Sequence, residues 1–138
     1  MTAEANETRL QRAFEAWNSR DLDGYLMLYD DSIKLHGYSP QPMDKASVRG
    51  FYEMIHHAFD GPKLTFHDVF SNGDRLAIRF TMTGTHRGEF LGIAPTGRNI
   101  WVDGITVLHF KNGRCVERWS SVDMYAWLAQ LGAVQPLG

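Results

Sequence analysis

Apolar side chains in the first part of the chain recur at spacings of three and four, which predicts helices with one buried face. A first helix ends before Asn18–Asp21, a short second helix follows it, and a third begins at Lys45 or Ser47. The predicted apolar faces are Leu10, Ala13, Phe14 and Trp17; Leu22, Tyr25, Leu26 and Tyr29; and Val48, Phe51, Tyr52, Ile55 and Phe59. Between the second and third helices, Ile33–His36 is predicted to form a brief strand.

The second half of the chain changes to an alternation of apolar and polar positions, which is typical of antiparallel strands that bury one face. Strands are predicted over 64–70, 75–82, 100–110 and 115–121, and helical spacing returns at Met124–Leu131. Asn112-Gly113 lies between the last two strands and is the strongest hairpin signal in the chain, because this dipeptide favours a two-residue turn.

Helices followed by an antiparallel meander indicate an α+β fold, with the N-terminal helices packed on one face of a curved sheet. A sheet that bends over helices leaves a cone, and the mouth of that cone is a natural ligand pocket. With 138 residues and 15.7 kDa, we expect residues 1–138 to form a single domain.

Composition narrows the function classes. A formal net charge of −2 leaves no basic excess for phosphates, so a general nucleic-acid binder is not expected. The single Cys115 excludes an intramolecular disulfide and fits a reducing compartment. No apolar run approaches the roughly 18 residues of a membrane helix, and the polar N-terminus shows no secretory signal. We therefore expect a cytoplasmic protein that does not bind membranes.

Two segments carry a resemblance to a known family. Phe90–Arg98 reads FLGIAPTGR, and Asn112–Trp119 reads NGRCVERW, with Asp123 four residues beyond the tryptophan. Over roughly residues 7–132 the chain resembles the SnoaL-like polyketide cyclase (ester cyclase) branch of the NTF2-like superfamily. The resemblance implies an NTF2-like cone, a homodimer, and a cofactor-free intramolecular aldol condensation of a small hydrophobic, carbonyl-containing substrate. Polyketide, steroid-like and small hydroxy-acid ligands all stay open.

The resemblance also implies that Asp123 is the acid/base. If Asn112-Gly113 is a plain two-residue turn, Leu108 faces Glu117 and Thr106 faces Trp119. Alternate residues share a face, so Glu117, Trp119 and Asp123 would then line the cavity with Thr106. A carboxylate in that position loses hydration, and its pKa rises toward the range useful for removing a proton next to a carbonyl. The alternative is that Asp123 caps the final helix.

The other candidate site residues are mainly histidines. The same register places His109 and Asp103 on the opposite face, unless a β-bulge reverses the facing. His109 is thus a candidate electrophilic partner or an exposed histidine. His86 is predicted to point inward, where it is either a substrate contact or a core histidine. The same two alternatives apply to His36. Thr106 and Trp119 are candidate donors to the developing enolate.

No metal site or cofactor is expected. His56-His57 are adjacent, so their side chains diverge on a helix, and neither has the partners that a metal site needs. No phosphate-binding loop, dinucleotide motif or nucleophile elbow is present.

Two hypotheses compete with the interpretation of the chain as an enzyme of the cyclase/isomerase type. One is a non-catalytic small-ligand binder, and the other is a dimerisation module whose cone is filled by its own side chains.

Overall fold

The computed structural model describes residues 3–136 of the chain, which form four helices and five strands within that range. In chain order the elements are α1 (Ala3–Asn18), α2 (Leu22–Leu26), β1 (Tyr29–His36), α3 (Lys45–Ala58), β2 (Phe59–Asn72), β3 (Arg75–His86), β4 (Asn99–Lys111), β5 (Arg114–Val122) and α4 (Met124–Gln130). None of the helices in this range is long and apolar enough to cross a membrane.

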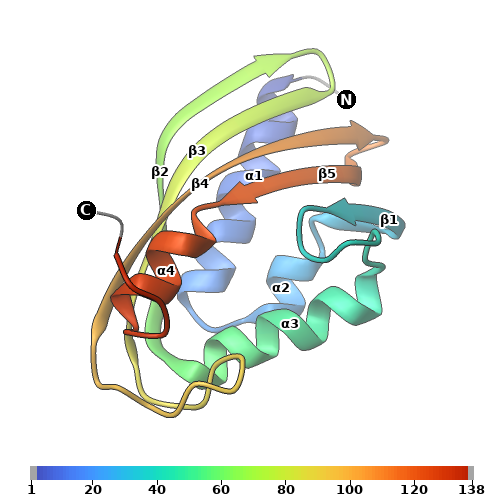
Figure 1. The fold of residues 1–138 in the computed structure, drawn as a ribbon. Coiled ribbons are helices and arrows are strands. Elements are labelled where there is room, and N and C mark those ends of the chain that lie inside the picture. Colours follow the sequence, from blue (N-terminus) through green and yellow to red (C-terminus); the bar gives the residue numbers. More distant parts are fainter. Residues whose placement is uncertain (1–2, 137–138) are drawn as a thin grey trace.

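The five strands form one mixed sheet in the order β1-β5-β4-β3-β2. β1 runs parallel to β5, and the other neighbours are antiparallel. Figure 1 shows the sheet curving over α1, α2 and α3, with α4 beside the end of β5. The α+β fold, with N-terminal helices on a curved mixed sheet, is confirmed.

The core fills the space between the helices and the concave side of the sheet. Leu10, Phe14 and Trp17 of α1 are almost fully buried, as the helical spacing predicted. On β3, Leu76, Ile78, Phe80 and Met82 are buried while their neighbours Arg75 and Arg79 are exposed. Phe14 joins the two layers, since its ring lies 4.0 Å from that of Phe66 on β2. Helix and sheet therefore share one apolar core.

Two element boundaries differ from the sequence prediction. Tyr29 begins β1 instead of continuing the second helix, because α2 ends at Leu26 and the chain then pairs with Cys115 of β5. At the other boundary, β2 already begins at Phe59, and the Gly61-Pro62 break lies inside this strand as a register shift between Asp60 and Lys63. A bulge takes up a proline that a regular ladder would not accommodate.

The hairpin at Asn112-Gly113 is confirmed, but the register beyond it is not the predicted one. Both turn residues have positive φ, 52° and 81°, as a type I′ turn requires. Phe110 pairs with Cys115, yet His109 pairs with Glu117, so Val116 is an extra residue in β5. This bulge reverses the facing of every later residue in the strand.

The reversal brings a different set of side chains to the concave side. Leu108 now pairs with Arg118, and Thr106 pairs with Ser120. Arg118 is buried, whereas Trp119 is exposed on the outer side. The expectation that Glu117 and Trp119 line the cavity was therefore wrong, because the plain two-residue-turn register omits the bulge.

Gly37 joins the end of β1 to the concave side of β5, and we predict that it tolerates no side chain. Its φ is +94°, and a Cβ there would lie 1.9 Å from the carbonyl oxygen of Ser120. Gly92 is a matched control, because its φ is +81° and the space around it is open. Both alanine variants should lose about 1–2 kcal/mol to the left-handed backbone.

In urea denaturation, Gly37→Ala should lose at least about 2 kcal/mol of unfolding free energy beyond Gly92→Ala, because its clash is with backbone. Equal losses in the two variants would contradict the close contact between Gly37 and β5.

Candidate active site

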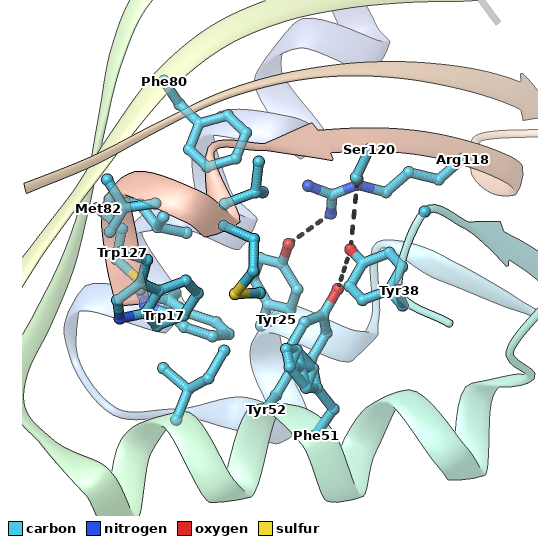
Figure 2. Close-up of a pocket in the computed structure, with 16 residues that line it drawn as sticks. Trp17, Tyr25, Tyr38, Phe51, Tyr52, Phe80, Met82, Arg118, Ser120 and Trp127 are labelled. Atoms are coloured by element: carbon cyan, nitrogen blue, oxygen red, sulfur yellow. Dashed lines mark hydrogen bonds between the residues drawn. The ribbon is translucent and has the colours of Figure 1, made fainter. Parts of the chain in front are cut away.

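A partly open cavity of about 100 Å³ lies between the helices and the concave face of the sheet. Its wall is mostly aromatic and aliphatic, with Arg118, Ser120 and several tyrosines as the polar part. The lining residues are Trp17, Tyr25, Gly37, Tyr38, Phe51, Tyr52, Ile55, Leu64, Phe80, Met82, Val102, Arg118, Ser120, Val122, Met124 and Trp127. Figure 2 shows these side chains converging from α1, α2, α3, the sheet and α4.

The polar part of the cavity is organised around the Arg118 guanidinium. Its Nη1 donates to the hydroxyls of Tyr25 at 2.7 Å and Tyr29 at 2.6 Å. Its Nε donates to Thr106 Oγ1 at 2.9 Å and to Ser120 Oγ at 3.0 Å. These hydrogen bonds come from α2, β1, β4 and β5, so the guanidinium is held in a fixed position.

The tyrosine hydroxyls extend this network along the cavity. The Tyr29 hydroxyl lies 2.6 Å from that of Tyr52, and the Tyr52 hydroxyl lies 2.8 Å from that of Tyr38. Since Tyr29 accepts a hydrogen bond from Arg118, its own proton is free to go to Tyr52. Figure 2 shows Tyr38 and Tyr52 meeting beside the end of Arg118. We call Arg118, Tyr25, Tyr29, Tyr38 and Tyr52 the arginine–tyrosine cluster.

Tyr29 and Tyr52 of this cluster are neutral donors at physiological pH. Burial raises the pKa of Tyr29 and Tyr52 well above the ordinary value of 10.0, and the nearby positive charge of Arg118 offsets only part of that effect. The guanidinium stays protonated, because arginine does not lose its proton in proteins. The cluster can therefore stabilise negative charge on a ligand oxygen, but Tyr29 and Tyr52 are poor proton acceptors.

Thr106 positions the guanidinium and does not line the cavity. Its side chain is fully buried, and its hydroxyl donates to the Trp119 carbonyl at 2.8 Å while accepting from Arg118 Nε. The sequence predicted that Thr106 contacts the substrate directly, whereas in the structure Thr106 is not part of the cavity wall. The inward facing of Thr106 itself was predicted correctly.

Asp123 lies at the end of β5 and caps α4. One carboxylate oxygen accepts a hydrogen bond from the Ala126 amide at 3.0 Å, and the side chain is exposed. Its neighbours Val122 and Met124 line the cavity, but Asp123 does not. The expectation of a desolvated carboxylate inside the cavity was wrong, because the bulge reverses the facing. The catalytic role stays a prediction.

Trp119, His36 and His109 form a ring cluster on the outer side of the sheet. The His36 ring is stacked on Trp119 at 5.1 Å, and the His109 ring lies 4.7 Å from the same indole. His36 Nε2 also lies 2.7 Å from a carboxylate oxygen of Glu117. The cavity wall includes none of these side chains. Substrate contact by Trp119 or His36, and electrophilic assistance by His109, therefore have no support from this geometry.

His86 is a buried residue that holds the loop after β3. Its Nδ1 accepts a hydrogen bond from the Thr96 amide at 3.1 Å, and its ring packs 5.2 Å from Phe59. The inward direction of His86 was predicted correctly. Because it is fully buried and does not line the cavity, it has the place of a core histidine.

Sequence reasoning missed the residues that form the polar part of the cavity. In the sequence, Tyr25 and Tyr52 are recognisable only as members of apolar helical faces. No local pattern indicates that the Arg118 side chain is buried. The only available signal was the strand alternation in Cys115–Val122. It is ambiguous, because Trp119 is the larger apolar group yet points outward.

Comparisons with known proteins identify relatives over most of the chain. A sequence profile of the SnoaL-like polyketide cyclases matches residues 7–131. Aklanonic acid methyl ester cyclase AcmA of Streptomyces galilaeus is 27% identical over 135 residues, covering 92% of this chain and 90% of AcmA. These matches support a cyclase role.

Solved structures give the same fold. AclR of Streptomyces galilaeus, named as a hydroxylase, superposes with a TM-score of 0.91 at 27% identity over 99% of this chain and 87% of its own. IdmH of Streptomyces antibioticus, named as a polyketide cyclase, has a TM-score of 0.79 at 29% identity, over 92% of this chain and 98% of its own. The NTF2-like cone expected from the resemblance is therefore confirmed.

His56, beside the cavity wall, makes the stability of the protein sensitive to acid. Its ring packs 4.3 Å from Trp17, and burial, helped by the positive charge of Arg20, lowers its pKa from 6.5 to about 4. Between these values the unfolded state binds more protons, so unfolding free energy falls as pH drops from about 6.5 to 4.

Replacing His56 with Phe should remove this part of the acid sensitivity, which amounts to at most about 3.5 kcal/mol at 1.4 kcal/mol per pKa unit. Urea titrations at pH values across that window measure it, with the exposed neighbour variant His57→Phe as the control. The account of His56 fails if His56→Phe and wild type lose stability in parallel.

Proposed function

Because the chain belongs to the SnoaL-like polyketide cyclase family, we propose that it is a cofactor-independent cyclase that closes a ring by intramolecular aldol condensation. Its substrate is a small, largely hydrophobic carbonyl compound of polyketide type. The name of AcmA, a cyclase of aklanonic acid methyl ester, supports this class of substrate. The mostly apolar, aromatic cavity fits such a compound.

The observation that carries the proposal is the arginine–tyrosine cluster at one side of the cavity. Removing a proton next to a carbonyl moves the electron pair onto the carbonyl oxygen, which becomes an enolate. Fixed donors in a water-poor site stabilise that charge without reorganisation. The Arg118 guanidinium and the hydroxyls of Tyr25 and Tyr52 are such donors, and the hydrogen bonds of the cluster hold them in place.

Asp123 is the proposed proton acceptor, acting from the edge of the cavity. A space of about 100 Å³ is smaller than the 300–1,000 Å³ of common ligand pockets, so a polyketide would extend beyond it. The extending part would pass Val122 and Met124, the two neighbours of Asp123. There the carboxylate would take a proton from carbon, the enolate would attack a second carbonyl, and the new alkoxide would take the proton back.

A second candidate function is non-catalytic binding of the same class of ligand. The observation in its favour is that the cavity-lining residues include no carboxylate and no imidazole within the described part of the chain. A binding protein on this scaffold needs only the aromatic wall and the hydrogen-bond donors. The two functions differ in whether a proton leaves the ligand.

The homodimer is also a proposal, with a second copy of the chain on the outer face of the sheet. Trp101, Ile105 and Trp119 project from β4 and β5 on that face, with exposed fractions of 58%, 55% and 38%. Large apolar side chains exposed on one face support an interaction site there. Two such faces brought together would cover one another.

Light scattering after size exclusion tests this pairing. Wild type should elute as a dimer, and Ile105→Lys should shift it to the monomer, because a buried unpaired charge destabilises the interface. Met27→Lys is the control, since Met27 is 67% exposed on the helical side. A monomeric wild type at high concentration, or a dimeric Ile105→Lys, would contradict the proposed interface.

Replacing Asp123 with Asn tests proton abstraction. Asn is as good an N-cap as Asp, so helix α4 is retained and only basicity is lost. We expect the deuterium exchange of acetophenone methyl protons, followed by NMR in D₂O, to slow about 10²–10⁴-fold.

The matched control is Asp44→Asn, because Asp44 caps α3 with the same kind of bond, to Ser47. It should exchange at the wild-type rate. Exchange by Asp123→Asn at the wild-type rate would remove the aspartate from the mechanism, and no exchange above buffer by wild type would favour the binding protein.

A further inference from the structure

Arg118 is a buried cation without an anionic partner among the described residues. Its exposed fraction is 4%, and the hydrogen bonds from its side chain all go to neutral hydroxyls. The ion pairs in the described part of the chain involve other residues, such as Arg49 with Asp23 and Arg79 with Asp68. No described residue therefore neutralises the positive charge at the cavity.

Two donors next to this charge are open to the cavity. The Arg118 Nη2 group forms no hydrogen bond to the described residues, unlike Nε and Nη1. The Tyr25 hydroxyl accepts from Nη1, and the structure gives its own proton no acceptor in that same part of the chain. Both residues line the cavity, and Figure 2 shows the end of the guanidinium turned toward it beside Tyr25.

An isolated charge in a water-poor site is costly, and a charge of opposite sign relieves that cost. Tyr29 and Tyr52 cannot supply this charge, because burial keeps both of them protonated. Glu117, the carboxylate next to Arg118 in sequence, points to the outer side and contacts His36 there. Since no described residue supplies the compensating anion, we infer that a ligand brings it.

We propose that the cavity binds its ligand as an anion, with an ionised oxygen on a flat conjugated ring held between Arg118 Nη2 and the Tyr25 hydroxyl. This inference rests on the proposed function only in taking the cavity as the ligand site. Carboxylates, phenolates and the enolates of acidic diketones share the required chemistry. A ligand that enters already ionised selects the site by charge before any reaction occurs.

The cavity walls favour one ring beside that oxygen. An apolar cavity of about 150 Å³ is known to hold benzene, so a partly open space of about 100 Å³ takes no more than a single ring between its walls. Trp17 and Tyr52 are in edge contact with ring centroids 5.1 Å apart, and Phe80 and Trp127 also line the space. Flat aromatic ligands pack well between such rings.

Calorimetric titration with benzoate and benzamide tests the charge requirement. The two probes have nearly the same shape, and only benzoate carries the ionised oxygen. Wild type should bind benzoate at least tenfold more tightly than benzamide. A second probe, 4-nitrophenol, reports ionisation by its visible absorbance and should bind as the phenolate, with its titration moved to lower pH on the protein. The two probes separate carboxylate from phenolate ligands.

Variants locate the effect. Tyr25→Phe keeps the ring and removes one donor, so benzoate should bind about tenfold more weakly while benzamide changes less. Arg118→Met should abolish the preference for benzoate, and Arg118→Lys, which retains the charge, should keep part of it. Arg79→Met and Tyr125→Phe are controls that remove the same groups from exposed positions outside the cavity. Thermal unfolding verifies that each variant is folded.

Equal binding of benzoate and benzamide by wild type would overturn the inference, and so would a failure of benzoate to bind. An unchanged preference for benzoate in folded Tyr25→Phe and Arg118→Lys would place the anion elsewhere and overturn it as well. The proposed cyclase function is tested separately by acetophenone exchange, since that neutral ketone can react even where benzoate has no advantage.

Discussion

The insertion of one residue, Val116, into β5 determines which side chains reach the cavity. The Asn112-Gly113 turn brings β4 and β5 together in the ordinary way, and the bulge then shifts the register by one. Arg118 and Ser120 thereby face the helices, and Glu117 and Trp119 face outward. Without the bulge, the concave side would carry a carboxylate and an indole in place of a guanidinium and a hydroxyl.

The consequence of that insertion is electrostatic. Arg118 enters a region walled by aromatic rings, where it meets hydroxyl groups from three other elements. Because those hydroxyls are neutral, they satisfy its hydrogen bonds but leave its charge uncompensated. A site of this kind is suited to ligands or transition states that carry negative charge on oxygen. The same arrangement stabilises the fold less than an apolar replacement could, which is a common feature of functional sites.

The fold could be predicted from the sequence, since the periods of the apolar positions and the Asn112-Gly113 turn are local signals. The side chains that line the cavity could not be predicted, because they depend on the β-bulge at Val116. No residue type at that position indicates a bulge. Asp123 shows the difference clearly. Its capping position was visible in the sequence, yet its exclusion from the cavity follows only from the register of β5. The cluster of Tyr25, Tyr29 and Tyr52 is formed by side chains from α2, β1 and α3. Contacts between separate elements have no local signature in the sequence.

The most direct measurement of the central claim is a crystal structure of the protein with benzoate bound. Our account predicts the ring among the aromatic side chains of the cavity, with carboxylate oxygens within hydrogen-bond distance of Arg118 Nη2 and the Tyr25 hydroxyl. A benzoate seated in the cavity with its carboxylate directed toward solvent, away from Arg118, would contradict the claim that the uncompensated guanidinium governs what this site binds.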